Sequence, residues 1–389
     1  MPDPLAFIDG ELQDLEARSL RRRLTIVQGP QGPRVTVGGR TLRLFCSNDY
    51  LGLANHPALT AAARQAVERY GCGTGASRLV SGTTEAHAAL EERLAGFLGT
   101  EAALAYPSGY AANLGAISAL VGQGDAVILD RLNHASIVDG ARLSGAKRLV
   151  YPHRDVERLR EVLERHTGFR RRLIVTDGVF SVDGDIAPLR EIEALARQHD
   201  AILMVDDAHG IGVLGERGQG TVEHAGLKRV DVLMGSLSKA LGASGGFIAG
   251  SRRLVDYLVN RSRGFIFTTA LPPDACAASV SALDLIASQP VLRARLWGNV
   301  ARVRDGLRSM GFDLMGSETQ ILPVLVGDAQ KAVELSEFLY ARGVFLSAIR
   351  PPTVPEGLSR LRLTVTTAHD EEDIAFLLEA MQDVRKRFF

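Results

Sequence analysis

The chain has 389 residues, of which 46% are hydrophobic, and its 45 basic residues balance 45 acidic ones. This length and apolar content are typical of a soluble globular protein with roughly two to three domains. The zero net charge argues against nucleic acid or an anionic membrane surface as a partner, because the chain has no general attraction to phosphate. Only five basic residues are lysines, so any lysine chemistry depends on Lys147, Lys228, Lys239, Lys331 or Lys386.

The cysteines and the apolar stretches give an expectation about the compartment. Cys46, Cys72 and Cys276 are far apart and form no CxxC pair, which favours a reducing, cytoplasmic location and predicts no zinc cluster or other metal site. The N-terminal segment has neither the basic residues nor the long apolar run of a signal peptide. The longest uncharged stretch, residues 102–124, is interrupted by Pro107 and several glycines, so no membrane span is predicted.

The first predicted element is a helix. Asp3-Pro4 is typical of a helix start, and apolar residues follow at helical spacing, which predicts a helix up to about the arginines at 21–23. A loop rich in glycine and proline at 28–33 and the alternation of Val35 and Val37 then predict a small hairpin. We expect residues 1–45 to belong to a small domain.

From about residue 57 the pattern changes to short apolar runs that alternate with amphipathic stretches. Such alternation predicts βαβ units, and therefore an α/β domain with a mainly parallel sheet between helices, over residues 46–288. A helix near 274–288 leads to residues 289–389, which are expected to complete a smaller α+β domain with strands near 321–326 and 361–365. The apolar runs of the large domain are 102–106, 126–129, 149–151, 173–176, 201–205, 230–234 and 247–249.

Polar residues follow five of these runs. In open parallel sheets the ligand site lies beyond the carboxyl ends of the strands, so these residues are expected to meet at one edge. A single one of them has an ordinary structural explanation, such as a helix cap, but an acid, two imidazoles, hydroxyls and a lysine at one edge favour a site. The segments are Ser108-Gly109-Tyr110, His134, Asp177–Ser181, Asp206–His209 and Ser236–Lys239.

The residue types in this set are those that pyridoxal phosphate requires. Gly109 and Tyr110 begin a predicted helix, whose free backbone N–H groups favour phosphate, and Ser236 adds a hydroxyl donor. Asp206 can pair with a protonated pyridine nitrogen, and Lys239 can form a Schiff base. The small residues around Lys239 leave room for a planar ring.

Three other motifs match the chain less well. Ser236–Lys239 fits the S-x-x-K of serine acylases, but the companion motifs of that class are absent. The segment 242–246 fits the G-x-S-x-G elbow of hydrolases, with Ser244 as nucleophile, yet no strand directly precedes it. The segment 71–76 fits a dinucleotide fingerprint but follows a predicted helix rather than a strand.

Four ordered motifs resemble the α-oxoamine synthases, which are fold-type I pyridoxal-phosphate transferases that condense an amino acid with an acyl thioester and release carbon dioxide. The resemblance covers essentially the whole chain. It implies a large cofactor domain with a smaller domain formed by both chain ends, and a homodimer with active sites at the subunit interface. The motifs are 47–53, 176–185, 205–210 and the segment around Ser238-Lys239.

The resemblance also implies roles for individual residues. Lys239 would bind the cofactor, Asp206 would pair with its ring nitrogen and His134 would stack on the ring. Ser181 and His209 would approach the phenolic oxygen, while Gly109, Tyr110 and Ser236 would hold the phosphate or flank the ring. Thr269 matches a phosphate contact supplied by the neighbouring subunit. The substrate-side matches are Arg362 for the amino-acid carboxylate, Arg21 and Thr353 for the acyl group, and Asn48.

The segments 20–23 and 348–355 are most similar to the branch of the family that joins L-alanine to a pimeloyl thioester, on coenzyme A or a carrier protein, in biotin synthesis. The residues themselves do not exclude glycine or serine as the amino acid, nor a non-catalytic cofactor-binding domain. Arg21 lies in a triple-arginine run that is also typical of a solvated helix face. Asp177 stands where relatives often have glutamate, so its role stays open.

Overall fold

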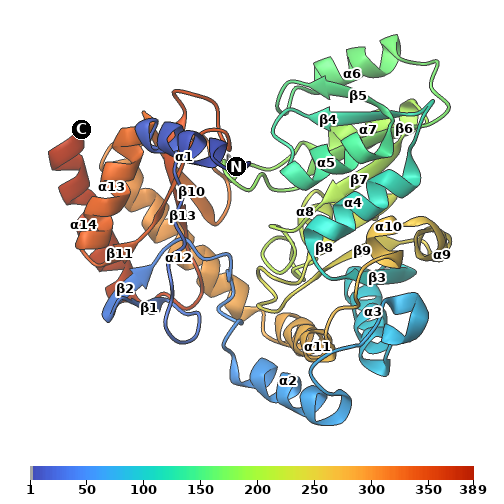
Figure 1. Ribbon diagram of the computed structural model, residues 1–389, viewed down its shortest axis with the longest axis horizontal. Helices are drawn as coiled ribbons and strands as arrows, with labels where there is room; N and C mark the ends of the chain where they lie inside the picture. Colours follow the sequence, from blue (N-terminus) through green and yellow to red (C-terminus); the bar gives the residue numbers. More distant parts are fainter. Residues whose placement is uncertain (1–2) are drawn as a thin grey trace. The chain divides into compact units, whose positions relative to one another are not determined.

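The computed structural model describes residues 3–389, which form two compact units (Figure 1). Unit 1 comprises the chain through Ser47, Val182–Gly184 and Arg295–Phe389. Unit 2 comprises Asn48–Ser181 and Asp185–Ala294. The sequence analysis placed the domain boundaries after residues 45 and 288. It did not assign Val182–Gly184 to the same unit as the two chain ends.

Unit 2 is built on a seven-stranded sheet with the strand order β3-β9-β8-β7-β6-β4-β5. The pairs from β5 to β8 are parallel, as predicted, whereas β9 runs antiparallel to both of its neighbours. Every residue of β3, β4, β8 and β9 is buried, which explains why these strands are continuous apolar runs. The strands are β3 (Ala102–Tyr106), β4 (Ala126–Asp130), β5 (Lys147–Tyr151), β6 (Arg172–Asp177), β7 (Ile202–Asp206), β8 (Val232–Ser236) and β9 (Gly246–Gly250).

Helices cover both faces of this sheet (Figure 1). The helix α4 packs on α5, β8 and β9, and α11 packs on α2 and α3. The long helix predicted at 274–288 is confirmed as α11. The helical elements of unit 2 are α2 (Pro57–Tyr70), η1 (Arg78–Gly82), α3 (Glu85–Leu98), α4 (Gly109–Leu120), α5 (Ala135–Ser144), α6 (Val156–Arg165), α7 (Leu189–Gln198), α8 (Thr221–His224), α9 (Arg252–Arg261), α10 (Arg263–Ile266) and α11 (Pro273–Ser288).

Unit 1 combines two three-stranded sheets with helices. The predicted hairpin is confirmed as β1 paired antiparallel with β2, and β11 adds to β2 in parallel. In the second sheet β13 lies between β10 and β12. Its elements are α1 (Phe7–Ala17), β1 (Arg34–Val37), β2 (Arg40–Leu44), β10 (Ile321–Gly327), α13 (Ala329–Ala341), β11 (Val344–Phe345), β12 (Ser347–Ile349), β13 (Ser359–Thr364) and α14 (Glu371–Phe388), with most of α12 (Val291–Ser309).

The predicted extent of the first helix is wrong, because α1 ends at Ala17 and not at the arginines 21–23. The backbone turns at Ser19, whose φ is 54°, and the N–H groups of Leu20 and Arg21 both donate back to the carbonyl of Leu15. These bonds stop the helical ladder before the arginine run. No residue of α1 is buried.

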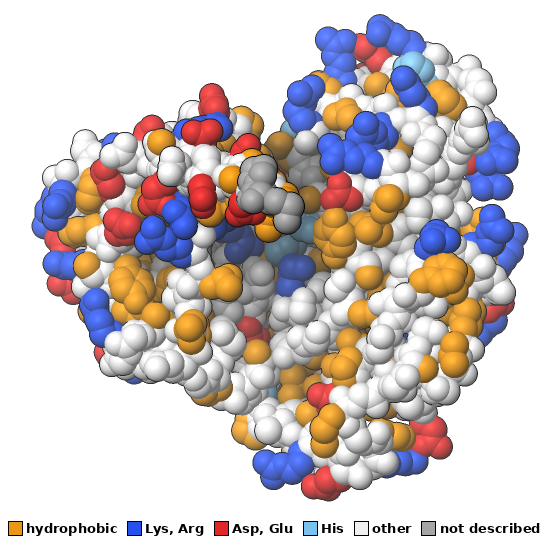
Figure 2. Space-filling view, viewed as in Figure 1, with side chains coloured by type: hydrophobic (Ala, Val, Ile, Leu, Met, Phe, Trp, Pro, Cys, Tyr) orange, Lys and Arg blue, Asp and Glu red, His pale blue; other side chains and the backbone are white. Residues whose placement is uncertain are grey.

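No single helix among residues 3–389 is long and apolar enough to cross a membrane, although α11 and α12 pass that test as a pair bent by 79°. Acidic and basic side chains both occur over the visible face of each unit (Figure 2).

Candidate active site

The five predicted segments lie at one edge of the unit 2 sheet. The strands β4, β6, β7 and β8 are parallel, and β3 has the same direction as β8 because both pair antiparallel with β9. Their carboxyl ends therefore deliver the segments beginning at Ser108, His134, Asp177, Asp206 and Ser236 to the same edge.

The beginning of α4 forms a site for an anion. The Ser108 hydroxyl caps the helix by accepting from the backbone N–H of Ala111 at 3.1 Å. Within residues 3–389, the backbone N–H groups of Gly109 and Tyr110 have no acceptor, so they remain available to a ligand. A Cβ added at Gly109 would lie 2.8 Å from Met234 Cε and 3.9 Å from Ser236 Oγ. The helix start and the end of β8 therefore lie close together at residue 109.

Lys239 lies in the tight loop between β8 and β9. The Leu237 N–H donates to the Gly245 carbonyl at 3.0 Å, and the Gly242 N–H donates to the Lys239 carbonyl at 2.9 Å. Ser236 Oγ and Ser238 Oγ are 2.9 Å apart, so two hydroxyls lie beside the lysine in the chain. These backbone bonds fix the lysine's Cα at the same sheet edge.

A chain of hydrogen bonds connects Asp206 with His134. The Asn113 amide donates to Asp206 Oδ2 at 2.7 Å and to Ser136 Oγ at 2.8 Å. Ser136 Oγ is in turn 2.7 Å from His134 Nδ1. The second oxygen of Asp206 accepts from the backbone N–H of Ala208 at 3.1 Å. Both the carboxylate and the imidazole are thus held in one orientation.

The electrostatic environment keeps His134 neutral at neutral pH. Burial lowers the pKa of His134 below its ordinary value, and the positive charge of Lys239 lowers it further against the opposing effect of the Asp206 carboxylate. These three side chains therefore lie within electrostatic range of one another. A neutral imidazole is suited to packing on an aromatic ring without adding a charge.

His209 is positioned by Tyr50. The Tyr50 hydroxyl lies 2.6 Å from His209 Nδ1 and donates to Asn48 Oδ1 at 3.2 Å. Tyr50 is fully buried, and His209 is 7% exposed. The structure therefore brings the predicted residues Asn48 and His209 together through a residue to which the sequence analysis assigned no role.

The structure gives Asp177 a structural role. Its Oδ2 accepts from the Asn133 amide at 2.8 Å and from the backbone N–H of His134 at 3.0 Å, so it holds the loop that carries His134. Burial, reinforced by the neighbouring Asp206 carboxylate, raises the pKa of Asp177 well above its ordinary value. The raised pKa favours the neutral carboxyl, which has less repulsion toward Asp206, its direct partner in the β6–β7 ladder.

The remaining predicted residues are spread over both units. In unit 2, Ser181 follows β6, and Thr269 is exposed and forms a backbone bridge with Ser77. In unit 1, Arg21 pairs with Glu16 at 3.4 Å, and Thr353 accepts from Arg22, not from Arg21, at 3.2 Å.

Arg362 is the predicted carboxylate ligand and lies on β13 of unit 1. It is opposite Ser347 in the β12–β13 ladder and within electrostatic range of Cys46.

Sequence reasoning missed Asn113, Tyr50, Asn133 and Ser136, which orient the predicted groups rather than forming a motif themselves. One signal for Asn113 was available. It is a polar residue in the mainly apolar helix α4, and a buried amide requires a hydrogen-bond partner.

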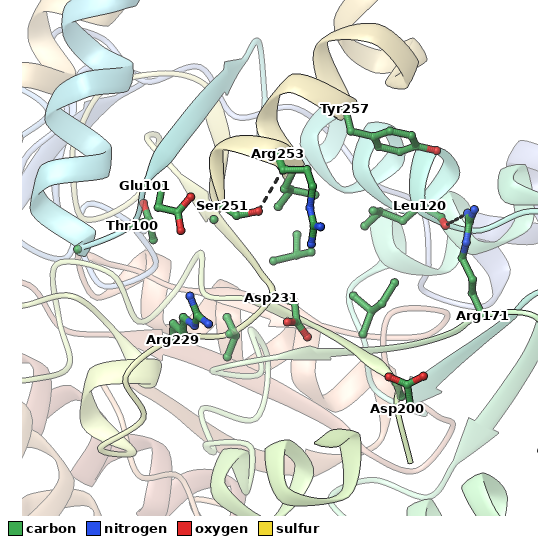
Figure 3. Close-up of a pocket in the computed structure, with 17 residues that line it drawn as sticks. Thr100, Glu101, Leu120, Arg171, Asp200, Arg229, Asp231, Ser251, Arg253 and Tyr257 are labelled. Atoms are coloured by element: carbon green, nitrogen blue, oxygen red, sulfur yellow. Dashed lines mark hydrogen bonds between the residues drawn. The ribbon is translucent and has the colours of Figure 1, made fainter. Parts of the chain in front are cut away.

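A separate pocket of about 1070 Å³ opens at the opposite edge of the sheet (Figure 3). It is lined by residues at the amino ends of β3, β6, β7 and β8, where Arg171, Arg229 and Arg253 are balanced by Glu101, Asp200 and Asp231. Neither lysine nor histidine is among its 17 lining residues. It therefore lacks the chemistry found at the carboxyl edge.

Comparisons with known proteins identify the family of the chain. Residues 41–381 match the family model described as aminotransferase class I and II. A curated relative, the 8-amino-7-oxononanoate synthase of Geobacter sulfurreducens, is 56% identical over 382 residues, which cover 97% of this chain and 98% of the relative.

Two solved structures show the same fold. A serine palmitoyltransferase variant from S. paucimobilis, with a bound PLP–myriocin aldimine, has a TM-score of 0.94 and 33% identity over 99% of both chains. An 8-amino-7-oxononanoate synthase from Francisella tularensis has a TM-score of 0.77 and 27% identity over 90% of this chain and 99% of its own.

Proposed function

This chain belongs to the aminotransferase class I and II family and, within it, to the α-oxoamine synthases; from that premise we propose that it condenses L-alanine with a pimeloyl thioester. The products would be 8-amino-7-oxononanoate, carbon dioxide and the free thiol, as a step of biotin synthesis. Curated relatives with this name match nearly the full chain at 50–56% identity. The observation that carries the proposal is the set of Lys239, Asp206, His134 and His209 at one sheet edge in unit 2.

The residues at this edge fit pyridoxal phosphate, the cofactor of the family. The open N–H groups of Gly109 and Tyr110, with the Ser236 hydroxyl, suit a phosphate. The oriented carboxylate of Asp206 suits a protonated pyridine nitrogen, and Lys239 supplies the amine for a Schiff base. His134 would stack on the ring, and Ser181 and His209 would approach its phenolic oxygen.

When bound, the cofactor supplies an electron sink for the negative charge that develops at the amino acid's Cα. The chain's own residues manage protons and orientation. Lys239 Nζ would take the proton from Cα and later return one, and the Asp206 carboxylate would keep the ring nitrogen protonated. Asn113 and Ser136 would hold Asp206 and His134 in place, at 2.7 Å from Asp206 Oδ2 and His134 Nδ1 respectively.

Four further residues are proposed to contact the substrates. The fork of Arg362 would bind the amino-acid carboxylate by two parallel hydrogen bonds, and Asn48 would also contact the substrate. Arg21 and Thr353 would contact the acyl chain. The bond from Arg22 to Thr353 supports a role for the arginine run in orienting this threonine.

A second candidate is the condensation of serine with a long acyl thioester. It is favoured by the TM-score of 0.94 with serine palmitoyltransferase, against 0.77 with the Francisella synthase. Sequence identity is the stronger guide to substrate within a shared fold, and it is 56% for the alanine branch against 33%.

We also propose a cytoplasmic homodimer in which Thr269 reaches the cofactor phosphate of the partner. The three cysteines are free, which suits a reducing compartment. Thr269 is exposed, as a residue that contacts a partner would be in the single chain.

The experiment is a substrate and labelling test. The purified protein should absorb in the near-visible, lose that band on borohydride reduction, and carry the label on Lys239. It should turn over L-alanine with pimeloyl thioester faster than serine with palmitoyl thioester or glycine with acetyl thioester. Lys239→Ala should lose both the borohydride-fixed label and turnover, while the exposed control Lys228→Ala should keep them. A preference for serine or glycine would refute the alanine assignment, and an active protein without the band would refute the cofactor chemistry.

A further inference from the structure

His153 lies between two buried carboxylates in unit 2. Its Nδ1 is 2.9 Å from Asp130 Oδ1, and its Nε2 is 2.7 Å from Asp185 Oδ2. The side chains of Asp130 and Asp185 are only 1% and 9% exposed. The edge of the imidazole also packs against Phe180, with ring centroids 4.4 Å apart.

Each of the two aspartates also holds a loop that carries a site residue. Asp130 ends β4 and begins the loop to His134, where its Oδ1 accepts from the Leu132 N–H at 2.8 Å and its carbonyl accepts from the Asn133 N–H at 3.1 Å. Asp185 closes the loop that contains Ser181, because its carbonyl accepts from the N–H of Phe180 at 3.0 Å.

Arg154, next to His153, joins the same two carboxylates. Its backbone N–H donates to Asp130 Oδ2 at 2.8 Å, and its guanidinium donates to Asp185 Oδ2 at 3.1 Å. Its φ is 57°, a left-handed conformation that is unfavourable for a residue other than glycine. The surrounding bonds therefore hold the backbone in a costly conformation, which indicates that this connection is tightly specified.

We propose that His153 is a positioning residue: clasped by Asp130 and Asp185, it locks the loop that carries His134 and the loop that carries Ser181 to each other. The inference rests on the proposed function, since these loops matter through the cofactor that His134 and Ser181 would contact. His153 itself would touch neither cofactor nor substrate.

The charges around the imidazole favour its protonated form. Burial by itself would lower the pKa of His153, but the hydrogen bonds and negative charges of Asp130 and Asp185 outweigh burial and raise the pKa to about 9. The groups that face it are Asp130 from the end of β4, Asp185 from the loop after β6, and Arg154 from its own loop. As a cation with two donors, His153 can bind both carboxylates at once.

The test uses the holoenzyme with three variants: His153→Gln, Asp185→Asn and the double variant. A glutamine side chain can donate to one carboxylate through its NH2 group, but its amide oxygen is only an acceptor. With Asp130 and Asp185 both ionised, that oxygen would face a negatively charged oxygen. In the double variant the amide introduced at position 185 can donate to that oxygen, so a neutral bridge becomes possible. The matched control is His224→Gln, which changes an exposed histidine in the same unit.

We expect each single variant to release pyridoxal phosphate at least about tenfold faster, as followed by the cofactor's absorption, and to lower kcat more than it raises KM. On a logarithmic scale, the double variant should cancel at least half of the increase in release rate that His153→Gln causes. Two substitutions with additive effects would instead release the cofactor faster than either single variant. The His224→Gln control should match the wild type.

The raised pKa gives a second measurement. Stabilisation by His153 is complete below the ordinary histidine pKa of about 6.5 and is lost as the pH rises through the folded value of about 9. The Tm gap between wild type and His153→Gln should therefore shrink from pH 7 to pH 10.

Several results would overturn the inference. One is a His153→Gln protein that is less stable but retains cofactor and spectrum like the wild type; another is a double variant with merely additive losses. If His153→Gln does not fold, the test is the rate at which the wild type releases cofactor. A release rate unchanged from pH 7 to pH 10 would contradict the proposed role of His153. A wild type that binds no pyridoxal phosphate would instead refute the proposed function.

Discussion

At the scale of single residues, Asn113 joins the two predicted catalytic groups. Its amide is fully buried and donates to both Asp206 and Ser136. A hydrogen bond to a charged group contributes about 1.5–3 kcal/mol, and its loss also leaves the partner without a donor. The orientation of Asp206 toward a ring nitrogen therefore depends on a residue outside the recognised motifs.

We predict that Asn113→Ala weakens binding of pyridoxal phosphate by about 10- to 100-fold, because about 1.4 kcal/mol corresponds to a tenfold change in affinity. Titration of the apoprotein with cofactor, followed by absorbance, measures the change. Asn260→Ala, on the exposed face of α9, is the control and should leave the affinity unchanged. An Asn113→Ala protein with wild-type affinity would mean that Ala208 alone orients the carboxylate.

The site residues divide into those that a sequence can reveal and those that it cannot. Asp206 ends β7, and His134 and Lys239 lie in the loops that follow β4 and β8, so the rule for parallel sheets was enough to place them at one edge. Tyr50 and Ser136 each join a near neighbour in the chain to a distant residue, His209 and Asn113 respectively, and spacing along the chain does not encode the distant contacts. The role of Asp177 could not be predicted, because its carboxylate accepts from the backbone N–H of His134 and no pattern of side chains indicates such a bond.

At the scale of elements, the loop between β8 and β9 depends on Gly242. Its φ is 65°, and a Cβ there would clash with the backbone nitrogen of Ala54 and lie 2.6 Å from the carbonyl carbon of Leu53. Backbone atoms so close to the added carbon cannot move aside cheaply. The close approach of the segment at 53–54 to the lysine loop therefore requires glycine at this position.

We predict that Gly242→Ala lowers the free energy of unfolding by about 2 kcal/mol or more and loosens the loop that holds Lys239. Thermal unfolding of the apoprotein and the yield of borohydride label on Lys239 measure the two effects. Gly298→Ala is the matched control, because α12 offers open space at that position and alanine favours a helix by about 1 kcal/mol. Equal effects of the two substitutions would contradict this account.

The hydrophobic pattern of the sequence did not predict the direction of β9 or the end of α1. The buried run at β9 was recognised as a strand, but an apolar run has no direction, so its antiparallel pairing with β8 and β3 could not be read. The end of α1 was misplaced because an arginine run is compatible with a helix. The stop comes from backbone bonds to Leu15, which depend on the fold of the turn.

At the scale of the whole molecule, unit 2 exposes an apolar surface consistent with the proposed dimer. Leu79 and Val80 in η1 are 52% and 80% exposed, and Phe267 is 70% exposed. The bridge between Ser77 and Thr269 brings these two segments together. Large apolar side chains gathered around the residue proposed to reach the partner indicate where a second copy would bind.

We predict that Val80→Asp converts the protein from a species of twice 41.8 kDa to the 41.8 kDa monomer in sedimentation velocity, with loss of activity. A charge at the centre of an apolar interface must be desolvated, which opposes association. Val150→Asp is the control, because Val150 is also exposed but lies on β5, at the other end of the sheet from β3. A Val80→Asp dimer, or a monomeric wild type, would refute this interface.

The strand β5 has a further consequence, for colloidal behaviour rather than for catalysis. It ends the seven-stranded sheet, so one side of its backbone is open to pairing with another chain. It begins with Lys147 and Arg148, both exposed, and charges on an edge strand oppose the addition of further strands. One of the four lysines outside the catalytic chemistry thus helps to keep the folded protein dispersed at high concentration.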